Sequence, residues 1–146
     1  TLRVAAELKD LGADTYPINK VMFGTKTIAR LRLEAALTES VEFYAGGLVG
    51  VCTMTQALLN RVGADSNDTD DISGFARGIE GVQIGVMIQE LKEGGAKISL
   101  RTGEDYNASD ICAEHKAAAG ASDPDGPDQA KKRILEAIAH SGVELG

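Results

Sequence analysis

The chain contains 146 residues, of which 43% are hydrophobic and 25% charged, and it carries a formal net charge of -7 at pH 7. The length suits one domain, or one small domain with a helical attachment, and the composition is that of a globular protein rather than a disordered or fibrous one. The negative charge argues against a broad basic surface that grips duplex nucleic acid, because such affinity comes largely from Lys and Arg, so any phosphate site must be local.

Residues 1–38 predict a helical segment. Apolar residues spaced for one face form a first helix, and Gly12 is placed to end it, because glycine readily adopts the left-handed conformation found after helices. Asp14 or Thr15 can cap a second, short helix. A third helix is expected over about residues 25–37. The apolar stripe that this third helix is expected to bury consists of Ile28, Leu31 and Ala35.

The pattern changes near residue 40 to that of an α/β domain. Alternating residues 41–44, two glycines that suit a tight turn, and a returning strand over 48–53 predict a β-hairpin. Two further alternating segments, 82–88 and 97–101, predict additional strands. The predicted fold class is therefore α/β: a mixed sheet of four or five strands flanked by helices and preceded by a short helical segment.

Cap residues and apolar spacing predict four helices between and after these strands. Each predicted start carries a threonine, aspartate or asparagine, whose side chain can accept a hydrogen bond from the first helical turn. Their expected limits are Thr53 or Thr55 to Gly63, Asp68 or Thr69 onward, Asn107 to about Ala113, and about Asp128 to His140.

Candidate functional residues gather between residues 97 and 120. Arg101 ends a predicted strand and points away from its apolar neighbours, and the pair His115 and Lys116 follows the next predicted helix. A tract of small residues ends at Gly120, and such residues let a backbone approach a ligand closely. Because Arg, His and Lys are donors that suit phosphate oxygens, these residues predict a phosphate pocket. The alternative is a set of surface charges beside an alanine-rich packing strand.

No catalytic or metal-binding motif stands out. The histidines and cysteines are scattered, the acidic loop 65–71 lacks EF-hand spacing, and there is no P-loop or GxSxG sequence. We therefore predict no catalytic residue, no metal ligand and no cofactor in this chain. The two unclustered cysteines and the lack of an apolar span favour a cytoplasmic protein with no membrane partner.

Several segments, taken together, resemble the C-terminal associated domain of the DHH phosphoesterases, the superfamily of RecJ-like exonucleases and bacterial oligoribonuclease/nucleotide phosphatases. Residues 28–33 resemble the helical connection before this domain in the oligoribonuclease branch, and residues 79–82 with the strand that follows resemble its central sheet. Residues 98–101 resemble the serine and arginine strand end, and 107–114 the following helix. Residues 115–120 resemble the end of the family signature: a glycine run, a histidine, one or two variable residues and Ala-Ala-Gly.

The glycine run of that signature is missing. Glu114 leads straight to the single histidine, His115. Either the protein has lost the loop, or the sequence omits a glycine-rich stretch, and we favour omission. Omission predicts that the Cα atoms from Glu114 to Lys116 include a neighbouring pair much farther apart than the ~3.8 Å of a trans peptide. His115 is then either the motif histidine or the residue before the glycines.

The resemblance implies a division of labour between two domains. Residues 1–38 would be the helical connector from a missing N-terminal DHH domain, and residues 39–146 the substrate-binding domain. In such relatives the N-terminal domain holds manganese and hydrolyses the phosphoester, so this chain alone is expected to be inactive. Its expected partners are short RNA or DNA, nucleotide phosphates and its own DHH domain.

The resemblance assigns Arg101, His115 and Lys116 to the substrate phosphate and Gly120 to a packing or close-approach position. The competing interpretation is an RNA-binding or dimerisation module without a hydrolase partner, as in the C-terminal domain of alanyl-tRNA synthetases, and it includes a homodimer. The lack of sustained heptads in residues 1–38 favours the phosphoesterase. The choice between a short RNA, a linear dinucleotide and an adenosine bisphosphate stays open.

Overall fold

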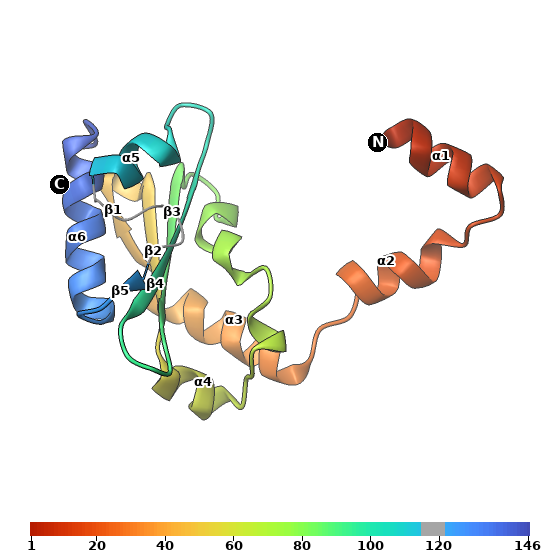
Figure 1. Cartoon of the computed structure of the whole chain (residues 1–146), viewed down its shortest axis with the longest axis horizontal. Coiled ribbons are helices and arrows are strands. Elements are labelled where there is room, and N and C mark those ends of the chain that lie inside the picture. Colours follow the sequence, from red (N-terminus) through yellow and green to blue (C-terminus); the bar gives the residue numbers. More distant parts are fainter. Residues whose placement is uncertain (115–121) are drawn as a thin grey trace.

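The computed structural model describes residues 1–114 and 122–146, which form a mixed sheet with helices on both faces (Figure 1). The strand order is β1-β2-β3-β4-β5; β2 and β3 run parallel, and the other neighbouring pairs are antiparallel. This confirms the predicted fold class. The strands are β1 Glu42–Tyr44, β2 Val49–Met54, β3 Ile84–Glu90, β4 Ala96–Thr102 and β5 Ser122–Asp123.

The helices begin and end largely where the cap residues predict. Asp14 accepts a hydrogen bond from the Tyr16 backbone N–H at 3.0 Å, and Thr55 accepts one from the Leu58 N–H at 3.1 Å. Gly63 ends its helix in the left-handed conformation, with φ 70°. The helices are α1 Leu2–Asp10, α2 Thr15–Phe23, α3 Ile28–Ser40, α4 Gln56–Val62, α5 Ala108–Glu114 and α6 Pro127–His140.

Each face of the sheet has its own apolar core. On one face, β2, β3 and β4 pack against α5 and α6. On the other face, β2 and β3 pack against α3, α4 and a series of 3₁₀ turns. The central strand β3 is therefore covered on both sides, which explains why residues of both parities in its first five positions are buried.

The predicted buried stripe of α3 is wrong. Ile28 and Leu31 are 64% and 47% exposed, whereas the buried residues of this helix are Leu33, Ala36 and Leu37. Apolar residues occur all around this helix, so spacing alone did not single out one face. The buried residues of α3 begin at Leu33, near its middle, and its start makes polar contacts, such as a 2.8 Å hydrogen bond from Arg30 Nη1 to the Asp68 carbonyl oxygen.

The helix expected after residue 68 is replaced by three 3₁₀ turns: η2 Asn67–Thr69, η3 Ile72–Gly74 and η4 Ala76–Gly78. Asp71 interrupts them with φ 57°, and glycines close the second and third turns. A continuous α-helix is unfavourable here because glycine costs about 1 kcal/mol in a helix interior.

Helices α1 and α2 form an arm that projects away from the sheet and its covering helices (Figure 1). Neither helix buries a residue. We refer to residues 2–23 as the N-terminal arm. Its exposed apolar side chains are Leu2, Val4, Leu8, Leu11, Tyr16, Ile18, Val21, Met22 and Phe23. Within the described ranges, no helix combines the length and the apolar character needed to span a bilayer.

Candidate functional site

Arg101 is the predicted site residue that the structure describes, and it lies near the end of β4. Its strand neighbour Leu100 is buried in the core shared with α5 and α6, so the alternation of the strand turns Arg101 to the opposite face, as predicted. There the exposed Arg101 side chain donates a hydrogen bond from Nη2 to Ser73 Oγ at 3.2 Å. Among residues 1–114 and 122–146, no carboxylate forms an ion pair with it.

Two glycines on neighbouring strands let the η4 turn lie directly on this same face. Gly50 and Gly85 are register partners in the parallel pair β2 and β3. A Cβ added to Gly85 would lie 2.5 Å from the Arg77 backbone nitrogen, and one added to Gly50 would lie 3.3 Å from a Val82 methyl carbon. Gly85 therefore makes room for the backbone of η4, and Gly50 makes room for the Val82 side chain.

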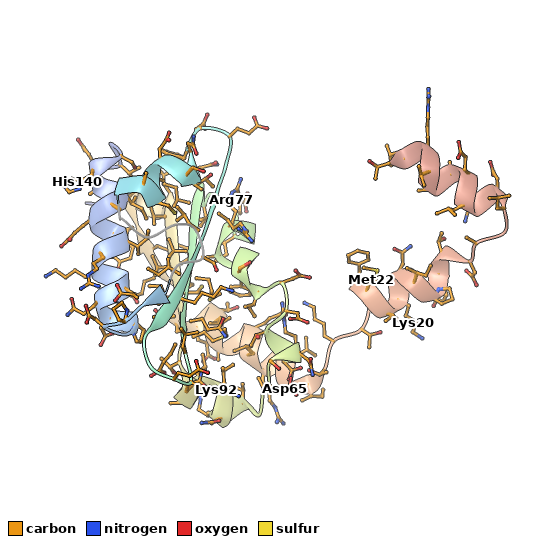
Figure 2. The ribbon with its side chains drawn as sticks, in the orientation of Figure 1. Lys20, Met22, Asp65, Arg77, Lys92 and His140 are labelled. Atoms are coloured by element: carbon orange, nitrogen blue, oxygen red, sulfur yellow. The ribbon has the colours of Figure 1, made fainter. Side chains whose placement is uncertain are left out.

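This close approach fixes Arg77, a residue that the sequence analysis missed. Its Nη1 donates to the Val82 carbonyl oxygen at 2.9 Å, and its Nη2 lies 3.1 Å from where a Cβ of Gly103 would be. The Arg77 side chain is half-buried and, like Arg101, has no described carboxylate partner. Figure 2 shows Arg77 on the side of the sheet away from His140, which belongs to α6. We call Ser73, Arg77 and Arg101 the arginine corner.

The remaining predicted site residues, His115, Lys116 and Gly120, lie outside the described residues. The expected long Cα separation between Glu114 and Lys116 falls there too. Helix α5, which precedes them, packs on the face opposite to Arg101. Convergence of these residues on Arg101 therefore stays a prediction.

No family model matches the chain. The bifunctional oligoribonuclease and PAP phosphatase NrnA of Thermus thermophilus is 33% identical over 152 residues, which cover 99% of this chain and 44% of that protein. The matched region is the C-terminal part of this relative. The chain is therefore similar to the C-terminal part of a DHH-family protein, as its sequence motifs predicted.

A solved structure supports the fold of this chain. The exopolyphosphatase-related protein from Bacteroides fragilis superposes with a TM-score of 0.79 at 19% sequence identity, over 95% of this chain and 42% of that one. The chain thus spans less than half the length of either protein.

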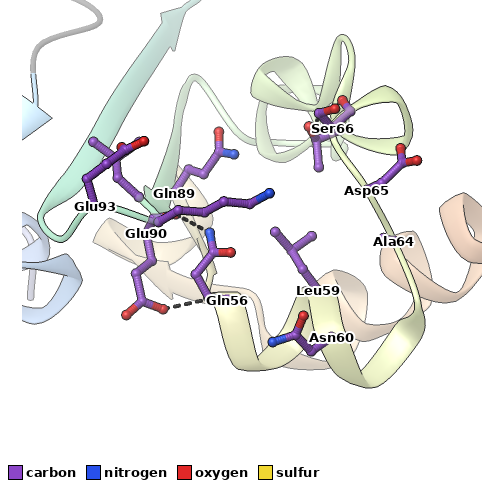
Figure 3. A pocket seen from close by; sticks show the side chains of 12 residues that line it. Gln56, Leu59, Asn60, Ala64, Asp65, Ser66, Gln89, Glu90 and Glu93 are labelled. Atoms are coloured by element: carbon purple, nitrogen blue, oxygen red, sulfur yellow. Dashed lines mark hydrogen bonds between the residues drawn. The ribbon is translucent and has the colours of Figure 1, made fainter.

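A separate cavity of about 310 Å³ lies between α4, the 64–69 loop and the end of β3 (Figure 3). Two of its lining residues already hydrogen-bond to each other. The Gln56 backbone N–H donates to Glu90 Oε2 at 2.8 Å, and Gln56 Nε2 donates to the Glu90 carbonyl oxygen at 2.7 Å. Three carboxylates against one lysine line this cavity, so it does not suit a phosphate. Its charged lining residues are Asp65, Glu90, Lys92 and Glu93.

The described part of the chain offers no metal cluster and no activated thiol. Residues 1–114 and 122–146 contain no group of three or more His, Cys, Asp or Glu side chains that could hold an ion. Both cysteines are free and buried. Burial raises the pKa of the Cys52 thiol to about 11 and also raises the pKa of Cys112, so both stay protonated at neutral pH.

Proposed function

We propose that this domain binds the phosphate of a nucleotide or short oligonucleotide, as the substrate-binding part of a metal-dependent phosphoesterase of the 3'-5' exonuclease, oligoribonuclease or nucleotide phosphatase type. The observation that carries the proposal is the alignment of nearly the whole chain with the C-terminal part of an oligoribonuclease and PAP phosphatase. Its name supplies the two substrate classes, short RNA and adenosine bisphosphate, that we propose for this chain.

The chemistry of Arg101 supports this role. An exposed guanidinium presents several N–H donors in a planar fork that matches two phosphate oxygens, and here no described carboxylate competes for it. The Ser73 hydroxyl beside it adds a neutral hydrogen-bonding group. We propose that His115 and Lys116 complete the site from the segment after α5 and that Gly120 allows close approach of the ligand.

We propose that hydrolysis belongs to a DHH domain that precedes residue 1. The described residues do not fit a manganese pair, because they hold no cluster of metal ligands and the arginine corner is cationic. The isolated chain is therefore expected to bind nucleotide phosphates without hydrolysing short RNA when manganese is added. A cytoplasmic location accords with its two free, buried thiols.

The N-terminal arm supports the proposal of a preceding domain. Short isolated helices are marginal in water, so most helices gain their stability by packing an apolar face. The arm has such apolar residues but buries none of them within this chain. Because more than half of the relative lies outside the matched C-terminal part, we propose that the arm packs against the catalytic domain of the same polypeptide.

Titration of the isotope-labelled chain with adenosine 3',5'-bisphosphate, followed by nuclear magnetic resonance, tests the binding role. We expect the backbone signals of β4 and the η3 turn to shift, and we expect Arg101→Gln to weaken binding by about tenfold, the scale of a lost charge-assisted hydrogen bond. Arg61→Gln is the matched control, since it removes an exposed arginine from α4.

Two results would contradict the proposal. One is equal affinity of the wild-type chain for adenosine and for the bisphosphate, because phosphate would then contribute nothing. The other is equal binding by the Arg101 and Arg61 variants, which would place the phosphate elsewhere. A chain that binds no nucleotide but forms a stable dimer in sedimentation would instead favour the dimerisation module.

A further inference from the structure

We infer that Arg77 binds the substrate phosphate together with Arg101, and that the pair selects a terminal phosphomonoester over a phosphodiester. This inference rests on the proposed function, because it adds a second cation and a substrate class to the same site. No motif points to Arg77 in the sequence. Its role follows from its position against two glycines of the sheet, Gly85 and Gly103.

The two arginines start from the same point of the sheet. Gly85 on β3 and Arg101 on β4 are antiparallel register partners, so their Cα atoms lie about 4.5–5.5 Å apart and their side-chain positions share one face. The backbone of Arg77 lies against that same position of Gly85, since a Cβ there would be 2.8 Å from the Arg77 Cα. Arg77 and Arg101 therefore leave neighbouring positions on one face.

The far end of Arg77 stays close to Arg101 as well. Gly103 lies two residues beyond Arg101, on the same face and about 7 Å further along the chain. The space that a side chain would fill at Gly103 is occupied by Gln83 Oε1, and Arg77 Nη2 borders it at 3.1 Å from the missing Cβ. The other terminal nitrogen of Arg77, Nη1, donates to the Val82 carbonyl oxygen. One of the five N–H donors of Arg77 therefore has a described acceptor.

The positive charges of Arg77 and Arg101 favour the binding of an anion at the arginine corner. Among the described residues, the other partly buried arginine, Arg30, is neutralised by Glu34, and the exposed Arg133 pairs with Asp123 and Asp125. Arg77 and Arg101 have no described carboxylate, although acidic residues outnumber basic ones by 22 to 15. Two neighbouring cations repel each other, and a bound anion removes this repulsion.

The presence of two cations in the arginine corner favours a phosphomonoester over a phosphodiester. A phosphomonoester carries about -1.5 to -2 charges at pH 7, whereas an internal diester carries only about one. Two guanidinium groups balance the charge of a monoester, and each can donate to a different oxygen of it. The arginine corner therefore recognises the phosphorylated end of a nucleotide or oligonucleotide rather than the backbone between nucleotides.

Adenosine 5'-monophosphate and its methyl ester test this inference, because they differ by one methyl group and one ionisation. We expect the wild-type chain to bind the monophosphate at least about fivefold more tightly than the methyl ester, as measured by titration with nuclear magnetic resonance. In Arg77→Gln the preference is expected to fall below about twofold, since one charge-assisted bond is lost. Arg61→Gln is expected to keep the wild-type preference.

The preference is a ratio within one variant, so a general loss of folded protein lowers both affinities and leaves the ratio unchanged. Arg77→Met serves as a second variant, because it keeps an aliphatic stem against the sheet if the glutamine variant folds poorly. Wild-type preference in either folded Arg77 variant overturns the inference. If Arg101→Gln still loses bisphosphate binding in that case, the proposed function stands. If the wild-type chain binds the monophosphate no better than adenosine, the proposed function itself fails.

Discussion

Gly85 is the position where one added methyl group is expected to disturb the arginine corner most. A Cβ there would lie 2.5 Å from the Arg77 backbone nitrogen and 2.8 Å from its Cα, well inside normal van der Waals contact. These neighbours are main-chain atoms, and the other face of β3 is buried as well. Neither side can yield by rotating a side chain, so Gly85→Ala must push the η4 turn away from the sheet.

The expected magnitude follows from two opposing effects. Overpacking a buried site typically costs about 1–3 kcal/mol, while alanine is favoured over glycine in a strand by roughly 0.5–1 kcal/mol. The free energy of unfolding should therefore fall by about 1–2 kcal/mol, which lowers the Tm by roughly 3–8 °C for a chain of this size. At Gly50 the added Cβ meets methyl carbons of the Val82 side chain at 3.3 and 3.4 Å, a milder contact, and the net change should stay within about 0.5 kcal/mol.

Differential scanning calorimetry and urea unfolding of the two alanine variants measure this difference. The pair is matched because both substitutions add one methyl group to register partners in the same sheet. A Gly85 variant as stable as the Gly50 variant would refute the close packing of η4 on β3. It would also remove the basis for placing Arg77 beside Arg101.

Two further predictions concern the arm and the edge of the sheet. Leu11→Ser, at a side chain that is 84% exposed, should change the free energy of unfolding of this chain by less than about 0.5 kcal/mol. Leu37→Ala, at a fully buried side chain of α3, should lower it by about 2–5 kcal/mol. A large loss of stability in the Leu11 variant, measured by urea unfolding, would mean that the N-terminal arm packs against the rest of the chain. The hydrogen bond from Lys131 holds the pKa of Glu42 below its ordinary value of 4.5. The stability that this ion pair contributes is therefore fully present above pH 4.5, and it is lost as the pH falls through the lowered pKa of Glu42 in the folded protein. Glu42→Gln should therefore be less stable than wild type at pH 7 and equally stable near pH 2, and a pH-independent difference would rule out this ion pair as the cause.

Local signals in the sequence were enough to predict most of the elements. The alternating segments gave four of the five strands to within two residues at each end, and Gly63 ended its helix as expected. Asn107 likewise caps α5, with its Oδ1 accepting the Ser109 N–H at 2.9 Å. These signals work because caps and alternation act within a few residues of the position they define.

The errors occur where distant contacts decide the structure. The buried face of α3 depends on which of its residues pack in the core with β2, β3 and α4, and its evenly spread apolar residues do not encode that choice. Arg77 was missed for the same reason, because its position is set by Gly85 and Gly103, which come later in the chain. Arg101 was found because strand alternation alone turns it to the face away from Leu100.

The charge of the whole chain sharpens the proposed selectivity of the arginine corner. A long nucleic acid must lie across much of the surface of a protein, and here that surface carries a net charge of -7, which repels phosphates outside the corner. In the proposed mode of binding, a mononucleotide or the end of a short oligonucleotide places its terminal phosphate between Arg77 and Arg101 and brings few others near the acidic surface. The pair of cations proposed to bind one phosphate group is thus also expected to discriminate by length, because each additional internucleotide phosphate adds repulsion without adding a partner.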